Sequence, residues 1–358
     1  MIVNNCFNKE KSYAVKGVAI LLLLFHHLFL NRERLVAYEI IPSDVLYAQI
    51  YPYVQMARIC VWIFVFVSAY GLSLKYKKYQ GNNLVFVLQN WLGLMKKWWI
   101  VYFLCVILYA CFCGNVFQYY ECSWKYIVFD FFEWNDLFDM PRVFGSWYLC
   151  FAQILMLFIP FLYIICEKLG WITLPIIFIL MQFSGEGIVS TGGGDYLKYF
   201  LTAVLGVLCA QTGMIDKLME RLNKRWVQVV VGALELIFVI AILRWQYYTP
   251  DFGMRYVSSI LSMVAAFLIC MLVTKCSGIV ERILAFFGKH SAVMFMTNVM
   301  LYIEFSDVVF ATHNPIVSYL TLVTLTVLFS CVADFLGKKS GYNKLFDKMN
   351  SLIERKRR

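Results

Sequence analysis

The chain of 358 residues is 61% hydrophobic and only 15% charged, with a mean hydropathy of +0.70 and a formal net charge of +10. Ordinary soluble domains are about 45–50% apolar and about 25% charged, so this composition excludes a soluble protein. The apolar runs are long enough for membrane helices rather than barrel strands, and we expect an all-α integral membrane protein.

The apolar runs predict about ten transmembrane helices. The first run, 13–30, starts like a signal peptide but lacks a small-residue cleavage site, so we expect it to stay as the first helix. Several runs are shorter than the ~20 residues that cross a bilayer upright, and the fifth is the weakest. The other nine runs are 53–74, 98–113, 145–166, 169–184, 197–213, 226–244, 256–274, 290–305 and 315–336.

The positions of lysine and arginine orient these helices. If the N-terminus is cytoplasmic, about three quarters of these residues fall in inner segments, as the positive-inside rule requires. We therefore expect both termini in the cytoplasm, and the net charge follows from topology without a nucleic-acid partner. The chain divides into a transmembrane domain over 1–340 and a basic cytoplasmic tail over 341–358.

The segment 114–144 is the longest predicted outer loop and is rich in aromatic residues. Two interpretations are open: a re-entrant or interfacial cover over an outward-facing cavity, or an ordinary packed loop.

The twelve cysteines are scattered and show no pairs at metal-binding spacing, so they predict no metal site.

Two ionisable residues lie on nearly one face of the first predicted helix. Lys16 and His27 are eleven positions apart, which is three turns plus ~20° and an axial separation of roughly 16 Å. His26 points ~100° away from them. Ionisable groups inside a span indicate function, and a neutral histidine can accept a proton near pH 7. A buried imidazole bonded to a neighbouring helix is the structural alternative for His27.

Other polar residues in or near the spans are weaker candidates for a pore or an acceptor site. Glu235 needs a partner or must stay protonated, whereas amides such as Asn298 and Gln153 more often make helix–helix contacts. Arg58 can meet an anionic sugar or simply extend to the interface. The full set is Arg58, Trp147, Gln153, Glu235 and Asn298.

Two further lysines precede the third predicted span. Lys96 and Lys97 follow the amphipathic stretch "NLVFVLQNWLGLM" and can bind phosphates at the inner surface. The alternative is that they only anchor the helix on the cytoplasmic side.

Five segments, taken together, resemble one protein family. The segment "VKGVAILLLLFHHLF" is similar to the opening helix of membrane-bound acyltransferase family 3, in which a cation, ten residues and a histidine match Lys16 and His27. The other similar segments follow in the family's order: "CVWIFVFVSAYGLSLKYKK", "GSWYLCFAQILMLFIP", "DYLKYFLTAVLGVLCAQTGMIDKL" and "FFGKHSAVMFMTN". The resemblance covers nearly the whole chain and marks 1–340 as an acyltransferase-type domain.

The chain departs from the family pattern at three places. Ala69 replaces a glycine in the second segment, and "MKKWWIVYF" stands where the family has Arg-x-x-Arg followed by a proline. Lys96 and Lys97 are therefore approximate substitutes for those arginines. Asn298 stands where the late helix of the family often has a histidine.

The resemblance implies an O-acyltransferase of a bacterial cytoplasmic (inner) membrane. It implies transfer of an acetyl or other small acyl group from acyl-CoA, as co-substrate, to a hydroxyl of a lipid-linked or cell-surface glycan. His27 would be the general base or an acyl relay, and Lys16, Lys96 and Lys97 would bind the anionic donor. No bound cofactor and no metal are implied.

Three other functions are open on the sequence. The main alternative is a polysaccharide flippase or transporter that uses Lys16 and His27 in a substrate pathway and binds no CoA. A glycan polymerase or ligase is a second, although the acidic loop 114–144 lacks the several arginines that we would expect of one. A catalytically silent relative is the third.

Overall fold

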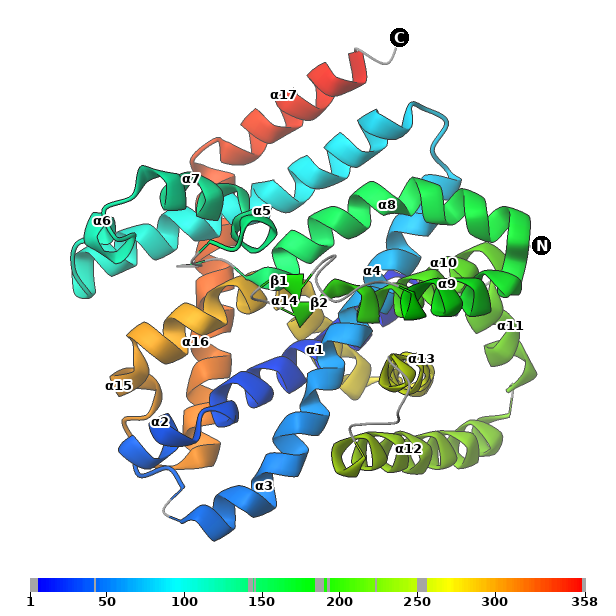
Figure 1. Cartoon of the computed structure of the whole chain (residues 1–358), viewed down its shortest axis with the longest axis horizontal. Coiled ribbons are helices and arrows are strands. Elements are labelled where there is room, and N and C mark those ends of the chain that lie inside the picture. Colours follow the sequence, from blue (N-terminus) through cyan, green and yellow to red (C-terminus); the bar gives the residue numbers. More distant parts are fainter. Residues whose placement is uncertain are drawn as a thin grey trace. The chain divides into compact units, whose positions relative to one another are not determined.

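The computed structural model describes residues 6–41, 43–140, 144, 146–183, 190–191, 194–222, 224–249 and 256–355, and most of them are helical (Figure 1). The α-helices are α1 (Lys9–Leu30), α2 (Arg32–Ala37), α3 (Asp44–Met56), α4 (Cys60–Lys77), α5 (Asn83–Phe112), α6 (Val116–Tyr119), α7 (Trp124–Phe132), α8 (Trp147–Leu169), α9 (Thr173–Gln182), α10 (Phe200–Thr212), α11 (Met214–Arg221), α12 (Arg225–Tyr248), α13 (Val257–Lys275), α14 (Ile279–Glu304), α15 (Ser306–Val309), α16 (Pro315–Lys339) and α17 (Tyr342–Arg355). The 3-10 helices are η1 (Ala57–Ile59), η2 (Asn135–Phe138), η3 (Gly170–Ile172) and η4 (Tyr196–Tyr199), and the two-residue strands β1 (Ser190–Thr191) and β2 (Gly194–Asp195) form a minimal antiparallel pair.

The helices confirm the prediction of an all-α integral membrane protein. Within the described ranges, eight helical stretches are long and apolar enough to cross a membrane. The pair α10–α11, bent by 68° at Gly213, makes a ninth if it is one broken span. Gly213 has φ of 63°, a left-handed conformation that ends helices and favours glycine.

The count is below the predicted ten because the weakest run does not form a span of its own. Its helix, α9, has ten residues, about half of what a bilayer crossing requires. It follows α8 after the short turn η3, which begins at Gly170 with φ of 58°. Figure 1 shows the chain turning back on itself between the end of α8 and α9.

The chain forms two compact units, each drawn from separate stretches of the sequence. The first unit comprises Met1–Lys77, Ile159–Gly185 and Tyr196–Ser291. The second comprises Lys78–Phe158, Glu186–Asp195 and Ala292–Arg358. The helices α8 and α14 therefore each contribute to both units.

Small residues bring the helices α4 and α10 of the first unit into close contact. A Cβ placed on Gly206 of α10 would lie 2.7 Å from the Phe66 carbonyl oxygen and 3.1 Å from the Ala69 Cβ of α4. Close backbone approach at small residues is a common way of packing membrane helices. Ala69, which departs from the family pattern, is tolerated here because the facing residue has no side chain.

In the second unit, α17 packs along the first half of the long helix α5. The Tyr342 hydroxyl donates to the Lys96 carbonyl oxygen at 2.7 Å, and Phe346 is 2% exposed. At 30 residues, α5 includes both the predicted third span and the amphipathic stretch before it. The segment predicted as a tail therefore includes a helix over 342–355.

The loop 114–144 also packs on α5 within the second unit. The indole nitrogens of Trp98 and Trp99 both donate to the Phe131 carbonyl oxygen, at 3.0 and 3.1 Å. The Tyr120 hydroxyl donates to the fully buried Asp130 carboxylate at 2.6 Å. These bonds fix the described part of the loop as short helices against a membrane helix.

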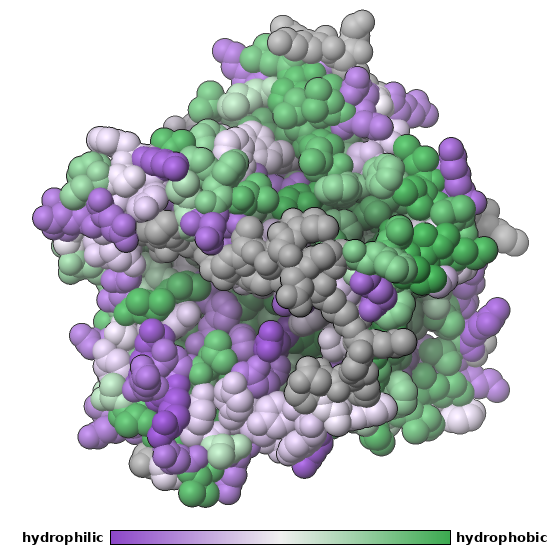
Figure 2. Space-filling model, viewed as in Figure 1, coloured by the Kyte–Doolittle hydropathy of each residue, from purple (hydrophilic) through white to green (hydrophobic). Residues whose placement is uncertain are grey.

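Large apolar side chains cover the outside of several spans, as expected of surfaces that meet lipid. Figure 2 shows hydrophobic surface on the right of the view, over α8 and α9. In α12 only 17% of the apolar window is buried, and Leu234, Ile237 and Phe238 are more than half exposed. The outer side of α12 therefore faces the acyl chains.

Candidate functional site

The first helix, α1, carries Lys16 and His27 and belongs entirely to the first unit. Asn8 caps its N-terminus by accepting a hydrogen bond from the Lys11 amide at 3.0 Å. Lys16 and His27 are both partly exposed, whereas Ile20 and Leu23 between them are 0% and 1% exposed. The face shared by the two ionisable residues is therefore packed against protein rather than lipid.

The two adjacent histidines have different surroundings. His26 is 9% exposed, and its Nδ1 lies 2.7 Å from the Val54 carbonyl oxygen of α3. A carbonyl oxygen only accepts, so the His26 Nδ1 carries the hydrogen and the bond ties α1 to α3. The ring of His27 lies 5.6 Å from that of His26 and stays partly exposed.

A tight crossing with α14 holds the end of α1 near Lys16. A Cβ on Gly17 would lie 1.9 Å from the Leu284 carbonyl oxygen, and one on Gly288 would lie 1.7 Å from the Tyr13 carbonyl oxygen. Only residues without a side chain permit this approach. The structure thus brings together two of the segments that carry the family resemblance, since Gly288 opens the "GKHS" of the fifth segment.

A cavity of about 800 Å³ lies near the N-terminus of α1, and its lining includes the cations Lys11, Arg225 and Lys275. We call it the basic cavity. The Lys11 Nζ lies 2.9 Å from a Glu281 carboxylate oxygen and also donates to the Cys276 carbonyl oxygen. Arg225 is exposed. The described residues that line this cavity contain no carboxylate.

The basic cavity adjoins an ion pair that explains Glu235. The Lys275 ammonium of α13 contacts the Glu235 carboxylate of α12, and the two side chains are only 6% and 12% exposed. A carboxylate in a span requires such a partner, so the pair supports a structural role for Glu235.

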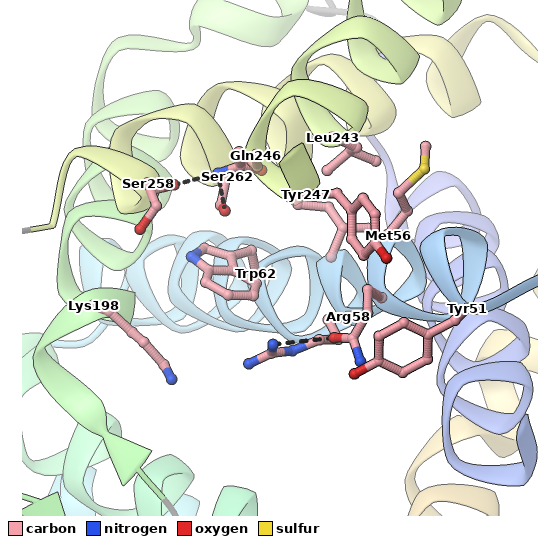
Figure 3. A pocket seen from close by; sticks show the side chains of 12 residues that line it. Tyr51, Met56, Arg58, Trp62, Lys198, Leu243, Gln246, Tyr247, Ser258 and Ser262 are labelled. Carbon is pink, nitrogen blue, oxygen red and sulfur yellow. Dashed lines mark hydrogen bonds between the residues drawn. The ribbon is translucent and has the colours of Figure 1, made fainter. Parts of the chain in front are cut away.

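A second cavity, of about 410 Å³, opens beside η1 and η4 (Figure 3). We call it the polar pocket, and its lining includes Tyr51, Arg58, Trp62, Lys198, Tyr247 and Ser258. Arg58 donates to the neutral Gln55 side chain at 3.3 Å. The Trp62 indole nitrogen is buried without a hydrogen-bond partner in the described part of the chain. Figure 3 shows the Arg58 and Lys198 side chains reaching into the same side of the pocket from different elements.

The polar pocket also contains a fixed amide. The Gln246 amide nitrogen donates to the Ser258 carbonyl oxygen at 2.6 Å and to the Ser262 hydroxyl at 3.0 Å. These bonds join the end of α12 to the start of α13. The side of the pocket formed by these two helices is therefore rigid.

The two cavities lie at opposite ends of the hairpin formed by α12 and α13. Gln228 of α12 lines the basic cavity and Gln246 lines the polar pocket, which separates them by about 27 Å along the helix. This is close to the ~30 Å of a bilayer core. The helix α1 also reaches both levels. Its residue Lys11 lines the basic cavity, and its residue His26 contacts Val54 of α3. The residue after Val54, Gln55, lines the polar pocket. His26, with His27 beside it, thus lies near the residues of α3 that line the polar pocket, although neither histidine is among the described lining residues.

Lys96 and Lys97 belong to the second unit. The Lys96 Nζ lies 3.5 Å from an Asp347 carboxylate oxygen of α17, with side-chain exposures of 27% and 73%. An exposed pair of this kind contributes little to stability, and Lys97 is exposed as well.

The remaining candidates of the second unit make internal contacts. The Gln153 carbonyl oxygen accepts from the Trp91 and Trp134 indoles at 2.8 and 3.2 Å, and its amide donates to the Phe132 carbonyl oxygen at 3.1 Å. Asn298 is 0% exposed and donates to the Phe295 carbonyl oxygen. Trp147 is half-buried, with its ring 5.9 Å from that of Tyr148. Gln153 thus fits the helix-contact alternative through Trp91 of α5, whereas the bond of Asn298 to Phe295 lies within α14.

Sequence reasoning missed most of both cavities. Their walls come from residues that look ordinary in the sequence, such as the cation Lys275 at a helix end or the amide Gln246 at another. One signal was available: Ser258 and Ser262 are four positions apart and so share a helix face at the start of an apolar run.

Comparisons with known proteins agree with the resemblance. A family model described as an acyltransferase domain, that of acyltransferase family 3, matches residues 13–335. The match spans nearly the whole chain and includes parts of both units. No curated protein and no solved structure matches the chain.

Proposed function

Because the chain belongs to acyltransferase family 3, we propose that this membrane O-acyltransferase moves a small acyl group from acyl-CoA to a glycan hydroxyl. Apart from the family, one observation supports the proposal: two cavities lie at the two ends of α12. The helix α1 extends from the level of one cavity to the level of the other. An enzyme that joins a donor and an acceptor from opposite sides of a bilayer needs two such openings.

The basic cavity is the proposed donor site. The phosphates of CoA are anionic. Lys11 and Lys275 are paired with Glu281 and Glu235, whereas Arg225 is exposed and forms no ion pair within the described ranges, so Arg225 is the lining cation that is available to a phosphate. The thioester stands at the far end of the pantetheine arm from these phosphates. Donor phosphates held at one end of α1 would therefore direct the acyl group along the helix, past Lys16. Lys96 and Lys97 remain predicted donor contacts.

His27 is the proposed base. Its imidazole takes the proton of the acceptor hydroxyl while that oxygen attacks the thioester carbonyl carbon. The C–S bond then breaks, the ester forms, and the CoA thiolate leaves and takes a proton. Alternatively, the imidazole first accepts the acyl group and passes it to the hydroxyl. The acceptor would be a lipid-linked or cell-surface glycan, and the site a bacterial cytoplasmic membrane with both termini inside.

Matched histidine substitutions test this proposal. We expect His27→Asn to abolish acetyl transfer from labelled acetyl-CoA by the purified protein in vesicles, because an amide cannot take the proton. His313→Asn is the control, since His313 is exposed, lies outside the spans and has φ of 51°, which asparagine tolerates. Full transfer by the His27→Asn variant would overturn the role of this residue.

A transporter is the alternative function and has a separate readout. Loss of a flippase stops export of the glycan, whereas loss of an acyltransferase leaves the exported glycan lighter by one acyl group per site. Mass spectrometry of the surface glycan with and without the gene separates the two outcomes.

A further inference from the structure

The polar pocket combines three features that together point to an acidic sugar. It contains a guanidinium, a buried donor without a partner, and aromatic rings. Its volume of about 410 Å³ falls within the range of about 300–1,000 Å³ that is typical of small-molecule sites. Resting on the proposed function, we propose that the polar pocket is the acceptor subsite and that it selects glycans bearing a carboxylate sugar through Arg58.

The charge of the residues that line the pocket is the first argument for an anionic ligand. The described lining residues include two cations, Arg58 and Lys198, and no carboxylate. Arg58 forms no ion pair within the described ranges, and the one hydrogen bond of its side chain there is to the neutral Gln55 amide oxygen at 3.3 Å. Since a guanidinium binds a carboxylate through two parallel hydrogen bonds, an anionic group is the ligand that this site lacks.

The second step concerns the indole of Trp62. Its nitrogen is buried and donates to nothing in the described part of the chain, which leaves a polar group unsatisfied. A ligand oxygen would satisfy it. The ring packs on Tyr199, with centroids 4.8 Å apart, so the indole is held in place to receive that oxygen.

The third step concerns the rings around the opening. Tyr51 and Tyr247 line the pocket with their centroids 6.3 Å apart, and each supplies both an apolar face and a hydroxyl. Sugar rings have apolar C–H faces and hydroxyl edges, which match such side chains. A simple inorganic anion would use Arg58 but not these aromatic faces, so the whole lining favours an acidic sugar.

Binding of two matched trisaccharides tests the proposal without any acyl donor. The probes are cellotriose and its C6-oxidised form, which differ only in the carboxylates. We measure their affinity for the full-length protein in phosphatidylcholine nanodiscs by calorimetry. We expect the oxidised form to bind at least about tenfold more tightly, with a preference that weakens as salt is added. Equal affinity of the two probes overturns the proposal.

Two charge-removing variants separate the pocket from the surface potential. Arg58→Gln should reduce the affinity for the oxidised probe to that for cellotriose. Arg244→Gln removes the same charge from the same end of α12, at an exposed residue outside the pocket lining, and should keep the preference. An equal loss in both variants overturns the proposal, because the preference then comes from general surface charge.

Lipid headgroups are tested in the same assay. If 20 mol% phosphatidylglycerol removes the preference, a headgroup phosphate occupies the pocket and the proposal fails. Because these measurements contain no acyl-CoA, they are independent of the His27 experiment. If the protein prefers the oxidised probe but transfers no acetyl group, only the proposed enzymatic function is overturned. If it transfers acetyl groups but binds both probes equally, only the inference about the polar pocket is overturned.

Discussion

Gly288 of α14 lies so close to Tyr13 of α1 that a Cβ on the glycine would fall 1.7 Å from the Tyr13 carbonyl oxygen. The backbones of the two helices are in contact at this point, one turn from Lys16. The crossing fixes α1, and therefore the proposed catalytic face, against the first half of α14.

A methyl group at this crossing should be destabilising. We expect Gly288→Ala to lower the free energy of unfolding by about 1–3 kcal/mol or more, because the backbone of α1 must move. Gly71→Ala in α4 is the matched control, since nothing lies within 4 Å of its added Cβ. Thermal unfolding of both variants in detergent measures the difference, and equal melting temperatures would contradict the crossing.

The contact between α4 and α10 predicts compensation between two positions. Gly206→Ala should destabilise the protein because its new Cβ meets Phe66 and Ala69. Adding Ala69→Gly removes one of these clashes, so the double variant should recover part of the loss. Its recovery stays partial because the Phe66 carbonyl oxygen remains. A double-mutant cycle on melting temperature checks this, and strict additivity would contradict it.

The pair of Glu235 and Lys275 predicts a strong asymmetry between single and double substitutions. Lys275→Met leaves a buried carboxylate without its partner and should cost about 3–5 kcal/mol. The double variant Glu235→Gln and Lys275→Met should recover most of that cost, because no charge is left unpaired. Unfolding free energies of the wild type, Lys275→Met and the double variant test this prediction. A double variant as unstable as Lys275→Met would show that the unpaired Glu235 carboxylate is not the cause of the lost stability.

The basic cavity predicts a kinetic effect at one cation and not at its neighbour. If the proposed donor site is right, Arg225→Gln should raise KM for acetyl-CoA by about threefold to tenfold with little change in kcat, since it binds ground and transition states alike. Lys224→Gln removes an adjacent exposed charge that does not line the cavity. Steady-state kinetics of both variants provide the comparison, and an unchanged KM in the Arg225 variant would move the donor site elsewhere.

Hydropathy alone was sufficient to predict the fold class, because backbone groups in lipid must be satisfied within helices. It was less reliable for boundaries. The helix α5 continues from Asn83 through the predicted start of a span near Lys97, since no proline interrupts the amphipathic stretch. Conversely, the run at 169–184 is apolar enough to suggest a span, yet Gly170 turns the chain and α9 ends after ten residues.

The candidate site was predictable only where its parts lie on one helix. Lys16 and His27 share α1, so helical geometry relates them without any tertiary information. The need of Glu235 for a partner also follows from the sequence, but the identity of Lys275 depends on how α12 and α13 pair. The polar pocket draws on α3, η1, α4, η4, α12 and α13, and no spacing in the sequence brings Arg58 and Lys198 together.

Because the outer side of α12 is exposed, we expect the surrounding lipid to influence the reaction. One rod of 24 residues carries the rims of both openings, and its apolar side is solvated by acyl chains rather than by protein. Hydrophobic mismatch can tilt such a helix, so we expect membrane thickness to change how the two rims lie against the neighbouring helices, although their separation along α12 is fixed. Turnover should therefore follow the chain length of the surrounding lipid, with an optimum at one thickness.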